Sequence, residues 1–179
     1  MLTLRKITAS EYEAMYESGI LSEDERLELI EGEIHTMQAI GKNHFVTVDR
    51  LSNQFKSYLQ NQVIVRVQNP LHLSETFVPQ PDLCLLNFRA DYYAETDPKP
   101  EDINLVIEVA DSSLEYDRNY KLPLYAEAGL AEVWIVNLKN KQLELYRNPK
   151  GRDYLLRLLV KTGDAVAPLA FPELEKVWL

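Results

Sequence analysis

The sequence predicts an α/β fold of the α+β type, in which short apolar strands alternate with helices. The runs 82–86 and 105–110 are too apolar for surface loops and too short for buried helices, which indicates interior strands. Residues 43–61 have apolar side chains at helical spacing and predict an amphipathic helix. With 179 residues and 46% hydrophobic composition, we expect one domain spanning residues 1–179 that buries roughly 70% of its unfolded surface.

Two helices are expected in the N-terminal part of the chain. The first covers residues 8–17 and the second residues 22–32, whose first residue and Glu25 have the spacing of a capping box. On the second helix Glu28 and Glu31 lie three residues apart and share a face. Two explanations stay open for this pair, a solvated acidic surface or a contact between one of them and a metal ion.

The rest of the chain alternates between strands and helical segments. A helix is expected from Asp117 to Ala128, but Pro123 is tolerated only near a helix start, so the regular helix begins near Asn119 or Tyr120, or it is kinked. The loop over residues 88–103 either carries substrate contacts or only connects two strands. Further strands are expected at residues 33–41 (with a turn), 63–68, 131–136, 142–147 and 153–161, followed by an extended tail that returns to the sheet.

Charge and composition narrow the classes of function. The formal net charge is −9, which argues against a protein that holds nucleic acid by general electrostatics. It argues less against a metal-dependent nuclease, because bound cations offset local carboxylates. The single cysteine, Cys84, is expected to be a buried apolar side chain. Without an apolar signal core or a run of about 20 apolar residues, we expect a cytoplasmic protein with no membrane span.

Three charged residues interrupt the apolar pattern of the two interior strands and the helix after them. Asp82 opens the first strand, Glu108 lies in the second, and Lys121 follows 13 residues later. A buried charge costs several kcal/mol, roughly, unless it is paired or binds a metal. Carboxylates without a nearby His or Cys cluster suit Mg²⁺ or Mn²⁺. A strand-entry cap for Asp82 and a plain ion pair between Glu108 and Lys121 remain the structural alternatives.

Three further residues are candidates for supporting roles. His44 begins the helix over residues 43–61, where it either contacts a phosphate, orients a site residue or is an ordinary polar residue at a helix end. Asp117 and Tyr125 flank Lys121 at i−4 and i+4. They either position the lysine or simply cap and pack the helix.

Longer motifs carry a resemblance to a known family. The strings ELIEGE, PQPDL, LVIEVADSSLEYDRNYKLPLYAEAGLAEVWIV and LELYR follow one another over roughly residues 8–170. In this order they resemble the Uma-two family of restriction endonucleases, within the PD-(D/E)xK nuclease superfamily. The resemblance implies a restriction-endonuclease-like core, a mixed central β-sheet of about five strands flanked by α-helices.

The same resemblance implies the roles of individual residues. Asp82 and Glu108 match the metal ligands of the family, and Lys121 matches its lysine, which lies on the following helix. Ala110 stands where the compact form of the motif has lysine. Glu28 matches a further acidic position and is expected to complete the metal ligands, with Glu31 as its substitute.

The function implied is metal-assisted hydrolysis of DNA phosphodiester bonds by an endonuclease. Asp82 and Glu108, with the carbonyl of Val109, would hold Mg²⁺ or Mn²⁺, and Lys121 would orient the attacking water or neutralise charge on the phosphate. A homodimer is expected because a duplex has two strands to cut. Two alternatives stay open: a catalytically inactive nuclease fold that serves as an interaction or regulatory protein, and a metal-dependent phosphoesterase acting on small nucleotides.

Overall fold

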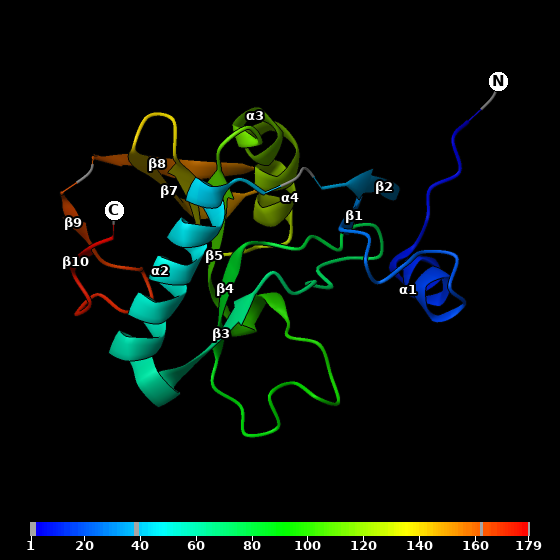
Figure 1. Cartoon of the computed structure of the whole chain (residues 1–179), viewed down its shortest axis with the longest axis horizontal. Helices are drawn as coiled ribbons and strands as arrows, with labels where there is room; N and C mark the ends of the chain where they lie inside the picture. Colours follow the sequence, from blue (N-terminus) through cyan, green and yellow to red (C-terminus); the bar gives the residue numbers. More distant parts are fainter. Residues whose placement is uncertain (1–2, 38–39, 162, 179) are drawn as a thin grey trace.

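The centre of the fold is a six-stranded mixed sheet with the order β3-β4-β5-β6-β7-β8 (Figure 1). The structure is a computed structural model that describes residues 3–37, 40–161 and 163–178. Only β5 and β6 run parallel, and the other neighbours are antiparallel. The strands are β3 (Val63–Val67), β4 (Leu83–Asn87), β5 (Ile103–Ala110), β6 (Glu132–Asn137), β7 (Gln142–Lys150) and β8 (Asp153–Lys161). The predicted mixed sheet is present, with six strands rather than about five.

Helices cover both faces of this sheet. The long helix α2 (Lys42–Leu59) packs on one face, and α3 (Leu114–Tyr116), a π-helical segment (Asp117–Lys121) and α4 (Leu122–Glu127) pack on the other. Side chains of a strand alternate between the faces. Because Ile107 and Val109 point toward α2, the intervening Glu108 points toward α4. The strand period therefore sends Glu108 to the face where the lysine-bearing helix lies.

The helix on the second face begins earlier than the sequence suggested. It starts at Leu114 rather than near Asn119, and its middle turn is a π-helix. There the N–H of Leu122 donates to the carbonyl of Asp117, five residues back. Pro123 has no N–H to offer the preceding turn, which favours such a widened turn just before it. The expected disturbance by proline is thus a π-segment inside a continuous helical stretch.

The N-terminal part contains a hairpin where the sequence suggested a second helix. Helix α1 (Ala9–Glu17) is present as expected, with a capping box at Thr8. The helix predicted for residues 22–32 is wrong: strands β1 (Leu27–Ile30) and β2 (Glu33–Thr36) form an antiparallel pair there. The Glu25 carboxylate does accept from the Ser22 N–H, 2.9 Å away, but this capping turn leads into a strand.

A tight turn explains why these residues form a hairpin. Glu31 and Gly32, between the two strands, both have positive φ angles, 51° and 74°. Two-residue turns with positive φ match the twist of antiparallel strands. A Cβ at Gly32 would lie 2.7 Å from the Lys6 Cβ. Glycine is therefore required by the closeness of the segment around Lys6 as well as by the backbone angle.

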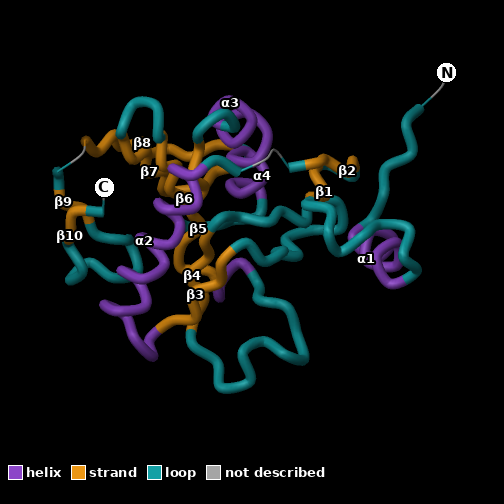
Figure 2. The backbone as a smooth tube through the Cα atoms, in the orientation of Figure 1, coloured by secondary structure: helices purple, strands orange, loops and turns teal. Residues whose placement is uncertain are grey.

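The hairpin and α1 lie to one side of the sheet (Figure 2) and are joined to it through the segment 74–80. Leu29 of β1 forms an antiparallel bridge with Val78, and the Gly32 N–H donates to the carbonyl of Thr76, 2.9 Å away. Leu29 packs into the small apolar cluster around α1. The side chain of the preceding residue, Glu28, therefore points to the opposite face of β1.

The remaining segments complete the molecule without contributing to the site. Residues 88–102 connect the ends of β4 and β5 that lie away from Asp82 and the end of β5 (Figure 1). The short segments are the 3₁₀ helices Gln60–Gln62 and Pro100–Asp102 and the strands β9 (Ala165–Val166) and β10 (Lys176–Val177). The tail forms its own ladder with Trp178 stacked on Phe55, rather than joining the sheet.

Three smaller expectations can also be compared with the structure. Cys84 is buried in β4 as expected, with 1% of its surface exposed. The turn expected after β2 falls partly on residues 38–39, which lie outside the described residues. In the described part of the chain, no helix combines the length and apolar character needed to cross a membrane.

Candidate active site

Side chains from four parts of the fold meet at one end of the central strands. Glu28 comes from β1, Asp82 lies one residue before β4, Glu108 lies in β5, and Lys121 ends the π-helical segment. All four are at least 94% buried. Because β4 and β5 are antiparallel, the start of β4 and the end of β5 lie side by side, which brings the two strand carboxylates together.

Lys121 joins two of these carboxylates. Its Nζ lies 2.7 Å from Glu108 Oε1 and 2.8 Å from Glu28 Oε1. The helix therefore folds back over β5. This brings Lys121 to Glu108 although the lysine lies on the helix and not on the strand. Burial alone would lower the pKa of Lys121, but Glu108 and Glu28 raise that pKa well above its ordinary value. The lysine is thus held as a buried ammonium ion.

Glu108 carries the most unusual environment. Burial raises the pKa of its carboxyl to about 8, because the Lys121 ammonium offsets only part of the desolvation and Asp117 and Asp82 add repulsion. Its Oε1 also accepts a hydrogen bond from the hydroxyl of Tyr125, 2.6 Å away. Tyr125 therefore contacts the carboxylate directly instead of only packing the helix.

Asp82 is held by three donors. His44 Nε2 lies 2.9 Å from Oδ2, the Val109 N–H donates to the same oxygen at 2.8 Å, and Gln68 Nε2 donates to Oδ1 at 3.0 Å. Burial raises the pKa of Asp82, but the contact with His44 and the two amide donors outweigh burial, so that the pKa lies below its usual value. Asp82 is therefore an ionised, oriented carboxylate, and Val109 meets it through its N–H.

Two more expected residues have distinct surroundings. Asp117 is buried, its Oδ2 accepts from the Ser113 hydroxyl at 2.7 Å, and burial raises its pKa. It lines the same pocket as Lys121. Glu31 is not part of this cluster: it occupies the hairpin turn, is about half exposed, and forms an ion pair with Arg152 at 2.8 Å. The expectation of Glu31 as a substitute ligand depended on a helix that is not there.

The cluster opens into a cavity of about 230 Å³. Carboxylates outnumber cationic side chains among the described residues that line it. The acids are Glu28, Asp82, Glu108, Asp111 and Asp117, and the cations are Arg26 and Lys121. Such an excess of carboxyl groups over cationic side chains favours a bound cation, which would also stabilise the ionised form of Glu108.

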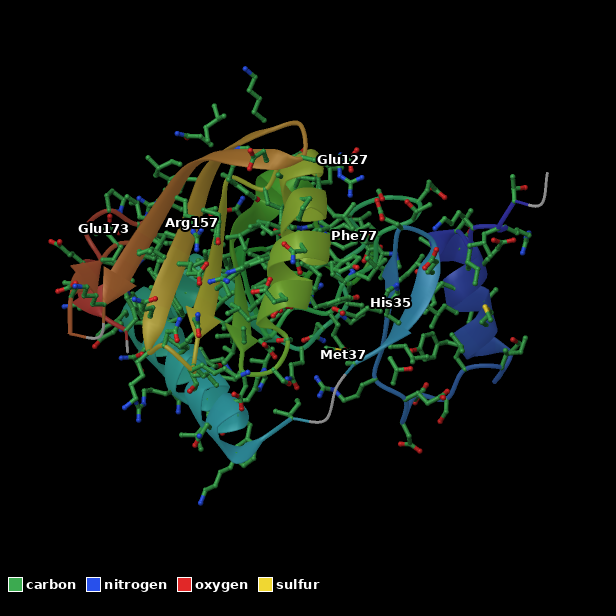
Figure 3. The ribbon with its side chains drawn as sticks, turned by 90° about the horizontal axis from the view of Figure 1, so that it is seen from above. His35, Met37, Phe77, Glu127, Arg157 and Glu173 are labelled. Carbon is green, nitrogen blue, oxygen red and sulfur yellow. The ribbon has the colours of Figure 1, made fainter. Side chains whose placement is uncertain are left out.

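Several lining or supporting residues were not found from the sequence. Gln68 follows β3 and carries no local signal of its role. Gln80 supports Glu28 through its backbone N–H, which donates to Oε1 at 2.7 Å, and its side chain donates to the Gln68 carbonyl at 2.6 Å. A backbone donor between two prolines leaves no side-chain signature in a sequence. Tyr116 and His35 also line the cavity; Figure 3 shows His35 on the hairpin and Met37 on the segment that leads to α2.

This mixed sheet, with carboxylates at one end of its central strands, places the chain in the restriction-endonuclease-like class of folds. The chain belongs to the Uma2 family, whose model is described as "Putative restriction endonuclease" and matches residues 9–178. A solved structure described as a putative nuclease belonging to DUF820, from Anabaena variabilis ATCC 29413, is similar to this chain with a TM-score of 0.74 and 16% identity. The likeness covers 96% of this chain and 95% of the other. No curated protein matches the chain.

The family match confirms the predicted family, whose description points to a nuclease. The structural likeness confirms the predicted fold class.

Proposed function

We propose that the chain is a divalent-metal-dependent endonuclease that hydrolyses phosphodiester bonds of DNA. The proposal rests on one observation above all: Asp82, Glu108 and Lys121 meet in a cavity whose lining carries more carboxylates than cations. Membership of a family described as restriction endonucleases supports it. The resulting arrangement contains the two kinds of group that phosphate chemistry needs, oxygen ligands for a cation and a fixed positive charge.

The residues present fit Mg²⁺ or Mn²⁺ as the cation. Among the residues that the structure describes, no three His, Cys, Asp or Glu side chains converge as a complete set of metal ligands. Mg²⁺ is commonly bound by one or two carboxylates together with water and substrate phosphate oxygens, without a protein cage. Asp82 and Glu108 would supply the two carboxylates, and Glu28 is the nearby third acid. When bound, the metal polarises the scissile phosphate and lowers the pKa of a coordinated water.

The protein's own groups prepare this chemistry. The donors around Asp82 and the Tyr125 hydroxyl fix the direction of the two carboxylates before substrate arrives, which reduces the reorganisation needed in the reaction. Lys121 holds a full positive charge at Nζ between Glu108 and Glu28. In the reaction this ammonium would stabilise negative charge on the phosphate oxygens.

A specific observation favours a second candidate, an inactive nuclease fold used for interactions. Lys121 already pairs with two carboxylates in a buried position, and such ion pairs also occur as plain structural contacts. The open cavity beside the pair favours the enzyme, since a structural ion pair has no need of one. The homodimer and the cytoplasmic location stay predictions.

Isothermal titration calorimetry with Mn²⁺ and Mg²⁺ tests the metal site directly. We expect binding by the native chain, and at least tenfold weaker binding by Asp82→Asn and Glu108→Gln, because each removes a charged ligand of nearly the same shape. Glu127→Gln, on the exposed end of α4, is the matched control and should bind like the native chain.

Cleavage of circular, linear and single-stranded DNA with Mn²⁺ then tests the reaction. Lys121→Ala is expected to reduce cleavage by two to three orders of magnitude, roughly the loss found when a charge-stabilising donor is removed. Folded native protein that neither binds metal nor cleaves any of these substrates would support the interaction protein instead.

A further inference from the structure

Three aromatic rings form a row beside the carboxylate cavity. His35 of β2 and Tyr116 of α3 have ring centroids 5.7 Å apart, with their planes tilted by 41°. Tyr116 and Tyr120 of the π-helical segment follow at 5.4 Å, with their planes 26° apart and stacked. We call this set, His35, Tyr116 and Tyr120, the ring row. It joins the N-terminal hairpin to the helix that carries Lys121.

The ring row runs from the cavity to solvent. His35 and Tyr116 line the cavity together with Asp82 and Glu108, whereas Tyr120 is 53% exposed. The hydroxyl oxygen of Tyr116 is buried and has no hydrogen-bond partner among the described residues. The exposed ring of Tyr120 at the outer end is available to whatever projects from the cavity.

Core packing does not account for the outer end of the row. Tyr116 packs against the apolar cluster under α4, so part of its surface has a structural use. Tyr120 belongs to none of the apolar clusters formed by the described residues and exposes more than half of its surface. A large exposed ring stacked on a cavity-lining ring is more useful as a contact surface than as a source of stability.

The charge of the molecule restricts what this surface can bind. Proteins that hold duplex DNA draw much of their affinity from many lysine and arginine contacts with phosphates. Here the net charge is −9, and of the two described cations that line the cavity, Lys121 already pairs with Glu28 and Glu108, which leaves Arg26. Much of the affinity for nucleic acid must therefore come from a source other than lysine and arginine. Stacking of bases on aromatic rings is such a source, and it is open only to bases that are not paired and stacked in a duplex.

We propose that the ring row is a stacking platform for an unpaired base next to the scissile phosphate, so that the substrate is single-stranded or locally unpaired nucleic acid. This inference rests on the proposed phosphodiester hydrolysis. The exposed face of Tyr120 receives a base, while the adjoining phosphate lies at the carboxylate cluster. Tyr116 supports Tyr120 from behind, and Tyr116 and His35 continue the aromatic surface into the cavity.

Fluorescence anisotropy with labelled oligonucleotides tests the proposal. The two labelled probes are a 12-residue oligothymidylate and the same strand paired with oligoadenylate. Ca²⁺ is present in every titration as a cation that holds phosphate oxygens. We expect the native chain to bind the single strand at least tenfold more tightly than the duplex. Tyr120→Leu should weaken single-strand binding by roughly tenfold, as for loss of one stacked base, while Tyr120→Phe stays within about twofold of the native chain.

A matched control separates a local effect from the general loss of an exposed tyrosine. Tyr92→Leu removes a ring that is 62% exposed on the loop at the opposite end of the strands (Figure 1), and its single-strand affinity should equal that of the native chain. Equal affinity of the native chain for single strand and duplex would overturn the proposal. So would unchanged single-strand binding by Tyr120→Leu, or an equal loss in Tyr120→Phe.

Failure of the proposal and failure of the proposed function give different results. Bis(p-nitrophenyl) phosphate is a phosphodiester without a nucleobase, and its Mn²⁺-dependent hydrolysis by the native chain reports on the reaction alone. Hydrolysis without single-strand preference would overturn the stacking platform and leave the nuclease intact. Single-strand preference without hydrolysis would support the platform on a protein that binds nucleic acid without cutting it.

Discussion

Two buried carboxylates on the same face of the sheet show how differently one fold treats buried charge. Glu108 of β5 and Glu144 of β7 lie in one cross-strand row, because both pair with Ile135 of the strand between them. The same helical stretch supplies a cation to each, Lys121 to Glu108 and Arg118 to Glu144. The two sites therefore differ in their surroundings rather than in their position in the fold.

The Glu144 carboxylate is fully hydrogen-bonded and lies away from the cavity. Two arginines contact its carboxylate, Arg118 through Nη2 and through Nε at 3.1 Å, and Arg157 at 3.0 Å, and the Tyr146 hydroxyl donates at 2.6 Å. Burial raises the pKa of Glu144, but these partners outweigh burial and hold the pKa below its usual value. Glu144 does not line the cavity.

The Glu108 site has the opposite balance. One lysine serves two carboxylates, burial raises the pKa of Glu108 to about 8, and the group opens on a cavity. A carboxylate whose hydrogen bonds are saturated by its own cations indicates a structural site. Carboxylates that outnumber their cations beside a cavity indicate a place that a ligand completes. This contrast predicts that a bound metal ion can restore the stability lost by substitution at the Glu108 site but not at the Glu144 site.

The largest effect is expected for Lys121→Met. Without the ammonium, Glu28 and Glu108 face each other with no cation, and the free energy of unfolding should fall by about 3–5 kcal/mol at pH 8. Mn²⁺ at millimolar concentration should recover part of this loss by binding between the carboxylates. Thermal melts with and without Mn²⁺ measure the recovery. If the metal raises the melting temperature of the variant no more than that of the native chain, Mn²⁺ does not take the place of the Lys121 ammonium between Glu28 and Glu108.

A smaller effect without rescue is expected for Glu144→Gln. The variant leaves Arg118 and Arg157 without their carboxylate partner, but both arginines are partly exposed to solvent. The free energy of unfolding should therefore fall by about 3 kcal/mol, the lower end for a broken buried ion pair. Urea unfolding measures the loss. Mn²⁺ should neither restore stability nor bind differently from the native chain, and weaker Mn²⁺ binding by this folded variant would show that the two sites are not independent.

The smallest effect is expected in the dependence of stability on pH. The folded chain holds the Glu108 proton more tightly than the unfolded chain does, so the contribution of Glu108 to stability falls as the pH rises from about 4.5 to about 8 and is constant above that. Glu144 behaves in the opposite way, because its lowered pKa makes stability fall only as the pH drops below 4.5.

Urea midpoints at several pH values separate these two contributions. Relative to the native chain, Glu108→Gln should gain about 1–2 kcal/mol between pH 5 and pH 9, less than the full shift in pKa implies because water and neighbouring groups relax around the charge. A difference between the two proteins that does not vary with pH would show that Glu108 titrates normally in the folded chain.

The sequence predicts the sheet and the residue types of the cluster better than it predicts which structural elements carry those residues. Asp82 and Glu108 are predicted because one opens and the other interrupts a short apolar run. The strand pattern of such a run can be seen without knowing its distant contacts. For Glu28 the sequence predicts a helix, because the capping box at Ser22 is a genuine local turn. The hairpin turn at Gly32 decides the outcome, because its backbone angle and its closeness to Lys6 leave room only for glycine.

Some supporting residues leave no local pattern at all. Gln68 and the backbone of Gln80 act through contacts between segments that the sequence does not show to be neighbours. The π-helical turn was anticipated only as a disturbance by Pro123, because the widened turn also depends on how Lys121 and Asp117 are buried beneath the helix. Long-range packing, rather than propensity, therefore sets the details of the site.

The contact between Glu28 and Lys121 joins residues 93 positions apart in the chain. Contacts of such long range form late in folding, because the intervening chain must lose its entropy before they can form. A growing chain on the ribosome contains Glu28 and Asp82 well before the helix with Lys121 has been made. The charged cluster is thus assembled only when most of the protein has been synthesised, so that a nascent chain surrounded by ribosomal RNA carries no complete site.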